Sequence, residues 1–189
     1  MTPFSLALVG GGVRSGKSAF ALALARTRGP RRVFLATAQA WDDEMAARIA
    51  AHRAERATGF ETIEEPLDPL AALERARGAD VVLLDCLTLW LSNLLLRGER
   101  EAAIHEKVVA LADALRAAPF AAIVVTNEVG MGIVPESPLG RTFRDVAGRA
   151  HQALAARADR VYFAMLGTVL RLAPGPVEVE PTPTPGEHP

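Results

Sequence analysis

Short apolar runs alternate along this chain with longer segments that carry apolar residues on one helical face. Runs that are apolar at nearly every position are typical of strands buried on both faces of a parallel sheet. The predicted strands are Phe4–Val9, Val33–Ala36, the more polar Phe60–Ile63, Val81–Asp85 and Phe120–Val125. With helices between them, the pattern predicts an α/β domain with a mostly parallel central sheet.

The intervening segments are predicted to be helices. They are Ala19–Ala25, Trp41–Arg56, Asp68–Arg77, Thr88–Leu96, Ala102–Ala118 and a segment from Ser137 to about Arg157. Asp68 and Ser137 are expected to cap the start of their helices, because short polar side chains accept hydrogen bonds from the first turn. Gly78 and Pro119 are expected to end the helices before them.

The C-terminal part of the chain changes in character. Val161–Met165 and Val169–Leu172, separated by Gly167-Thr168, predict a hairpin at the edge of the sheet. Prolines recur from Pro174 to the end, and such a composition cannot bury a core. The sequence therefore predicts a single domain over residues 1–172 and a proline-rich disordered tail over residues 173–189.

Composition narrows the functional classes. The chain has 189 residues, 50% of them hydrophobic and 23% charged, with a formal net charge of −1. This balance argues against extensive binding to nucleic acid. No apolar run reaches the about 18 residues of a membrane span, and the apolar start lacks a basic leader. The single cysteine, Cys86, suits a reducing compartment, so a cytoplasmic location is expected.

The strongest motif is Gly11-Gly12-Val13-Arg14-Ser15-Gly16-Lys17-Ser18, which fits the phosphate-binding pattern G-x-x-x-x-G-K-[ST]. Its glycines let the backbone present N–H groups to an anion, and the following helix adds the positive end of its dipole. Lys17 supplies a charge for the β- and γ-phosphates, and the Ser18 hydroxyl is a ligand for Mg²⁺. A strand before the motif and a helix after it argue against a glycine-rich turn that binds nothing.

A carboxylate follows the most apolar strand. Asp85 ends the run Val81–Asp85, as in a Walker B strand, where it would hold Mg²⁺ directly or through water opposite Ser18. An aspartate in this place can also merely cap the next helix. The phosphate-binding motif favours the first interpretation.

His52 has the most suggestive surroundings of the four histidines. Arg48 and Arg56 lie four residues away on either side, so in a helix the three side chains line one face, about 6 Å apart. Two cationic neighbours disfavour the imidazolium, leave a neutral, nucleophilic ring and attract phosphate. On these residues alone, a solvated surface histidine remains the simpler interpretation.

Several stretches carry a resemblance to a known family in one register from Leu8 to Leu172. They are Gly11–Ser18, Ala36–Gln39, Asp42–Met45, Ala47–Ile49, His52-Arg53, Glu64–Pro66, Asp85–Thr88, Asn127–Glu136, Phe143–Asp145 and Gly148-Arg149. Asn127–Glu136 is far more specific than a phosphate-binding loop. Through these stretches the chain resembles the bifunctional adenosylcobinamide kinase/adenosylcobinamide-phosphate guanylyltransferase family of cobalamin biosynthesis. Ala150-His151-Gln152 departs from the family, which more often has Asn before the Gln, and the tail lies outside the match.

The resemblance implies a RecA-like, three-layer P-loop fold, a homotrimer and two reactions. A nucleoside triphosphate, ATP or GTP, phosphorylates the aminopropanol hydroxyl of adenosylcobinamide. GTP then guanylylates the product through a guanylylated histidine, at the position of His52, to give adenosylcobinamide-GDP. Besides the phosphate-binding loop, the resemblance implies contacts to GTP from Ala36, Thr37, Ala38, Arg53, Ala54, Glu55, Arg56, Glu64 and Asp85.

Three alternatives stay open on the residues alone. The first is a P-loop kinase acting on another small alcohol, which corrinoid binding would distinguish. The second is a nucleotide-dependent switch, but Thr126-Asn127-Glu128-Val129 is not the Asn-Lys-x-Asp guanine motif of GTPases. The third is a RecA-like motor on nucleic acid, which the net charge and the lack of a basic–aromatic stripe disfavour.

Overall fold

The computed structural model describes residues 4–39 and 59–181, and these residues form an α/β fold around one eight-stranded sheet. The strand order is β3-β2-β4-β5-β1-β6-β7-β8, and the six strands from β3 to β6 run parallel. β7 and β8 are antiparallel additions at one edge. The strands are β1 Leu6–Gly11, β2 Arg32–Ala36, β3 Glu61–Glu64, β4 Val81–Asp85, β5 Ala121–Asn127, β6 Arg160–Met165, β7 Thr168–Ala173 and β8 Glu178–Glu180. The predicted mostly parallel sheet with an edge hairpin is confirmed.

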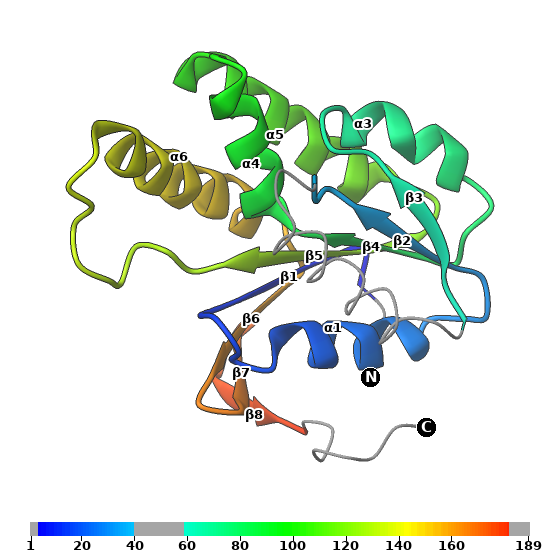
Figure 1. The fold of residues 1–189 in the computed structure, drawn as a ribbon. Helices are drawn as coiled ribbons and strands as arrows, with labels where there is room; N and C mark the ends of the chain where they lie inside the picture. Colours follow the sequence, from blue (N-terminus) through cyan, green and yellow to red (C-terminus); the bar gives the residue numbers. More distant parts are fainter. Residues whose placement is uncertain (1–3, 40–58, 182–189) are drawn as a thin grey trace.

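Helices cover both faces of the sheet, as Figure 1 shows, so the fold has three layers. α1 (Lys17–Arg26) lies on one face. The other face carries α3 (Pro69–Ala72), which continues as a 3₁₀ turn over Leu73–Ala76, together with α4 (Leu87–Leu96), α5 (Glu101–Ala117) and α6 (Pro138–Ala155). The predicted helix Trp41–Arg56 lies outside the described residues. No helix in the described ranges is long and apolar enough to cross a bilayer.

The apolar strands are explained by two separate cores. Leu6, Leu8, Val82 and Leu84 pack with α4, α5 and α6, while the residues that alternate with them pack with α1 on the opposite face. Successive side chains of a strand point to opposite faces, so a sheet covered on both sides needs apolar residues at every position.

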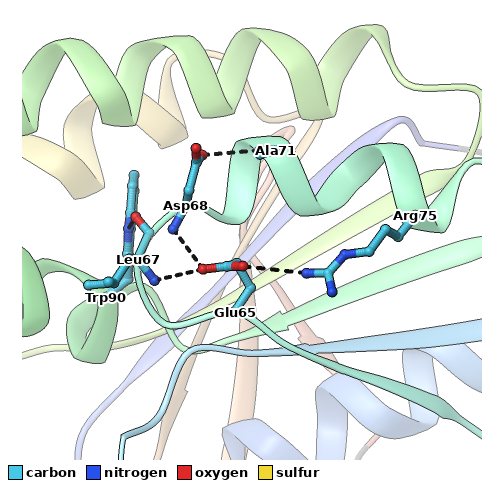
Figure 2. A network of polar contacts seen from close by, with 6 residues as sticks. All are labelled: Glu65, Leu67, Asp68, Ala71, Arg75 and Trp90. Carbon is cyan, nitrogen blue, oxygen red and sulfur yellow. Dashed lines mark hydrogen bonds and ion pairs between the residues drawn. The ribbon is translucent and has the colours of Figure 1, made fainter.

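Side-chain hydrogen bonds cap the N-termini of α6 and α3. Ser137 caps α6 by accepting from the N–H of Gly140 (3.1 Å), and Asp68 caps α3 by accepting from that of Ala71 (3.1 Å). Both caps confirm the predictions. Figure 2 shows the turn before α3, where the Glu65 carboxylate accepts from the N–H groups of Leu67 and Asp68.

This turn is also tied to neighbouring helices. Arg75 forms an ion pair with Glu65, and Trp90 of α4 donates its indole N–H to the carbonyl of Leu67 (Figure 2). The strand β3 and the helix that follows it are therefore held at a defined place on the sheet edge.

The C-terminal segment differs from the disordered tail predicted from Ala173 onward. β8 pairs with β7, with Val179 opposite Leu170, and Arg171 forms ion pairs with Glu178 and Glu180. The edge of the hairpin offers unpaired backbone groups, and the Glu-Val-Glu stretch has no proline, so it can use them. Residues 182–189 lie outside the described residues.

A buried polar network joins the carboxyl ends of the central strands. The Thr37 hydroxyl donates to the carbonyl of Cys86 (2.7 Å) and accepts from its N–H (2.9 Å), and the Asn93 amide donates to the carbonyls of Thr37 (2.8 Å) and Pro66 (3.0 Å). Thr37 is fully buried. Cys86 is buried, and burial raises the pKa of its thiol to about 11. The cysteine is therefore a structural member of the network.

Replacing Thr37 with valine keeps the side-chain volume but leaves the buried N–H of Cys86 without its partner. We expect Thr37→Val to lower the free energy of unfolding by about 1–3 kcal/mol in urea titrations. Thr62→Val, the same change at an exposed position of β3, is the control and should change it by less than about 0.5 kcal/mol. Equal changes in the free energy of unfolding at the two sites would show that the network does not contribute to stability.

Candidate active site

The phosphate-binding motif forms the connection between β1 and α1. A side chain at Gly11 would place its Cβ 2.5 Å from the carbonyl oxygen of Ala164 and 2.7 Å from the Ser15 hydroxyl, so only glycine fits there. Gly16, the residue before α1, has φ +92°, a conformation that other residues rarely adopt. These two glycines let the chain turn from the strand into the helix N-terminus.

Two buried polar groups inside this loop fit an anion. Lys17 is 9% exposed, and its ammonium donates to the carbonyl of Gly12 (3.0 Å). Burial lowers the pKa of Lys17, and the Asp85 carboxylate opposes that shift. The Ser15 hydroxyl is also buried and has no hydrogen-bond partner among the described residues. A desolvated cation and an unpartnered hydroxyl beside a helix N-terminus are suited to bind phosphate.

Asp85 lies at the carboxyl end of β4, between Ala36 of β2 and Val125 of β5. It is close enough to Lys17 to influence the pKa of that ammonium, so the Walker B-like residue lies near the phosphate-binding loop. Ser18 lies in the first turn of α1 and is half-buried. The described residues hold no group of three or more His, Cys, Asp or Glu side chains suited to a metal. A hydroxyl and one carboxylate suit Mg²⁺, which completes its shell with phosphate oxygens and water.

The other candidates on the described strands gather at the same edge. Ala36 pairs with Glu64 on one side and with Asp85 on the other, and the Thr37 N–H donates to the carbonyl of Asp85 (3.3 Å). Ala38 follows directly. In open α/β sheets, ligands bind beyond the carboxyl ends of the strands, and these residues occupy that position. The remaining candidates, His52, Arg53, Ala54, Glu55 and Arg56, lie outside the described residues.

The structure adds a cluster that the sequence did not single out as a site. The His151 ring of α6 lies with Nε2 2.8 Å from the Thr126 hydroxyl and with Nδ1 3.6 Å from the Glu128 carboxylate. The N–H of Glu128 donates to the carbonyl of Gly11 (2.9 Å). One sequence signal could have identified Glu128: it directly follows a buried strand, and Asp85 was singled out because it ends another buried strand.

The loop after Glu128 exposes apolar side chains. Met131, Ile133 and Val134 are 81%, 97% and 60% exposed. The Arg141 guanidinium donates to the carbonyls of Pro135 and Glu136. Arg141 therefore anchors the end of this loop to α6.

Comparison with known proteins supports the resemblance. The family model described as "Cobinamide kinase / cobinamide phosphate guanyltransferase" matches residues 7–172. The "Bifunctional adenosylcobalamin biosynthesis protein CobP" of Pseudomonas aeruginosa is 45% identical over 175 residues, which cover 92% of this chain and 98% of that protein. The "Bifunctional adenosylcobalamin biosynthesis protein CobU" of Salmonella typhimurium is 43% identical over 179 residues, covering 87% and 98%.

A third relative, the protein of the same printed name from Escherichia coli, is 42% identical over 179 residues. The matched range contains the phosphate-binding loop, Asp85, the strands β2 to β6 and all of β1 except its first residue, Leu6. The chain therefore belongs to the cobinamide kinase / cobinamide phosphate guanyltransferase family.

Proposed function

We propose that this protein phosphorylates adenosylcobinamide with a nucleoside triphosphate and then transfers GMP from GTP to the product, giving adenosylcobinamide-GDP. The observation that carries the proposal is the phosphate-binding loop with Lys17 and Asp85 at one edge of the sheet, in a chain of this family. ATP and GTP are both proposed as substrates, and Mg²⁺ as the cofactor. A homotrimer in the cytoplasm, acting on small molecules and not on nucleic acid, is part of the same proposal.

Phosphoryl transfer mainly requires that the reacting groups are positioned and that the charge on the phosphates is neutralised. The loop Gly11–Ser18 would hold the β- and γ-phosphates through its N–H groups, and Lys17 would place its charge against them. Ser18 and Asp85 would hold Mg²⁺, which neutralises phosphate charge when it is bound. Ala36–Ala38 and Glu64 lie at the same edge and are proposed to contact the nucleotide, together with Arg53–Arg56.

Guanylyl transfer in two displacements needs a nucleophile, and we assign that role to His52. Two of the other histidines are poorly suited to it. His105 is exposed on α5, and His151 directs its two ring nitrogens at Thr126 and Glu128. The arginines at positions 48 and 56 would keep the His52 ring neutral and attract the α-phosphate.

Lys17 is one of two lysines in the chain, which makes a matched pair of variants available. Lys17→Ala should lower the kcat of adenosylcobinamide phosphorylation by about 10²-fold or more, because a stabilising charge is lost in the transition state. Lys107→Ala is the control, since Lys107 pairs with Glu99 on the surface of α5. Wild-type turnover by Lys17→Ala would remove this residue from the active site.

Asp85→Asn removes the charge of the proposed metal ligand and keeps its size. We expect the Mg²⁺ concentration for half-maximal kinase activity to rise about tenfold or more, since even outer-shell partners of metals contribute about 10–100-fold in affinity. Asp113→Asn, on the exposed side of α5, should leave the Mg²⁺ titration unchanged. An unchanged titration of Asp85→Asn would assign the metal to other residues.

A covalent intermediate on His52 has a distinctive signature. The protein should gain label from GTP labelled at the α-phosphate and none from GTP labelled at the γ-phosphate, because pyrophosphate leaves. The bond should be labile in acid and persist in base, as a phosphoramidate does. His52→Ala should abolish labelling and guanylyl transfer and retain phosphoryl transfer, while His105→Ala should label normally. Full labelling of His52→Ala would place the nucleophile elsewhere.

A further inference from the structure

A second carboxylate lies at the carboxyl edge of the sheet, beside the phosphate-binding loop. Glu128 follows β5, the strand that pairs with β1, and the register places Asn127 opposite Gly11. The N–H of Glu128 donates to the carbonyl of Gly11 (2.9 Å), so its backbone is attached to the first residue of the loop. The phosphate and Mg²⁺ groups proposed above give this carboxylate no role.

The Glu128 side chain is held but remains accessible. Its Oε1 accepts from the N–H of Gly130, and its Oε2 faces Nδ1 of His151 at 3.6 Å. The side chain is 25% exposed. A carboxylate accepts hydrogen bonds at about four lone-pair positions, so these contacts leave capacity for a substrate hydroxyl.

His151 reaches Glu128 from α6 and is itself fixed by Thr126. Its Nε2 lies 2.8 Å from the Thr126 hydroxyl, which is almost fully buried in β5. Burial lowers the pKa of His151, with Glu128 acting in the opposite direction, so the net shift favours the neutral ring. The tautomer with the proton on Nδ1 directs N–H at the carboxylate and accepts from Thr126, whereas the other tautomer would set a lone pair against the carboxylate.

We propose that Glu128 is the general base that takes the proton from the substrate hydroxyl during phosphoryl transfer, and that His151 is a positioning residue for its carboxylate. This inference rests on the kinase part of the proposed function. The hydroxyl oxygen forms a bond to the γ-phosphorus as the bond from that phosphorus to the β,γ-bridging oxygen breaks. The bridging oxygen keeps the electron pair and leaves with the nucleoside diphosphate, and the hydroxyl proton passes to Glu128.

Two other groups at this edge are less suited to accept the proton. Asp85 acts on the Lys17 ammonium and is the proposed ligand of Mg²⁺, so its oxygens already have other partners. His151 has one nitrogen on Thr126 and the other toward Glu128, which leaves it no lone pair for substrate. The 3.6 Å separation from Glu128 exceeds a hydrogen bond, and catalytic contacts of this kind often tighten only when substrate binds.

The first test measures single-turnover phosphorylation of adenosylcobinamide by the full-length protein at saturating ATP and Mg²⁺. Glu128→Gln should lower the rate by about 10²-fold or more, since general bases contribute about 10²–10⁴-fold. The KM values and the labelling by α-labelled GTP should stay at wild-type levels, because neither uses this base. Glu136→Gln, in the exposed part of the same loop, is the matched control and should keep the wild-type rate.

The second test separates positioning from folding. His151→Ala should lower the single-turnover rate about tenfold without changing KM, because a misplaced catalytic group costs rate and not binding. His151→Asn should restore most of that rate, since its amide can donate from nearly the place of Nδ1. Melting temperatures of both variants report on the loss of the Thr126 contact, which the two share.

The outcomes separate this inference from the proposed function. A wild-type protein that transfers no phosphate to adenosylcobinamide overturns the proposed function and the base together. An active wild type with Glu128→Gln within tenfold of its rate overturns the base alone. If Glu128→Gln fails to fold, the His151 pair decides: recovery in His151→Asn supports the proposal, and equal losses in Ala and Asn overturn it.

Discussion

The structure depends on burying both faces of a parallel sheet while leaving one edge of it polar. Leu6, Leu8, Val82 and Leu84 face α4, α5 and α6, and their neighbours in sequence face α1, so the middle positions of the central strands are buried on both faces. Polar groups can then appear only where strands end. Because β2, β4, β5 and β1 run parallel and lie side by side, their carboxyl ends meet at one line, and the chemistry gathers there.

The buried network of Thr37, Cys86 and Asn93 supplies the hydrogen bonds that the backbone needs just beyond the ends of β2 and β4. The chain leaves β2 and β4 in a region without solvent, where every backbone group needs a partner. Thr37 satisfies two groups of Cys86, and Asn93 satisfies carbonyls from two different turns. Side chains thus replace the sheet hydrogen bonds that end one residue earlier, and Asp85 is fixed in place before any ligand arrives.

Periodicity and motifs predicted the strands, the caps at Asp68 and Ser137, and the loop with Lys17 and Asp85. Each is set by local sequence: an apolar run, a cap residue, a glycine pattern. β8 was missed because its pairing depends on the open edge of β7. The prolines elsewhere in the tail favoured a prediction of disorder for the whole segment. The contact between His151 and Glu128 was missed for a related reason. The two residues are separated by 23 positions, and only the packing of α6 on β5 brings the ring to the carboxylate.

The two carboxylates at this edge both lie at the ends of buried strands, but their neighbouring side chains differ. Asp85 ends β4 and Glu128 follows β5, so both stand beyond buried strands next to the phosphate-binding loop. Asp85 shares its surroundings with the Lys17 ammonium, which agrees with the proposed role of this carboxylate in holding Mg²⁺ beside the phosphates. Glu128 faces the ring of His151, whose pKa is lowered by burial, and has no cation from α1 beside it in the contacts described. One sheet edge therefore carries two carboxylates beside the phosphate-binding loop, and side chains from α1 and α6 give them different partners.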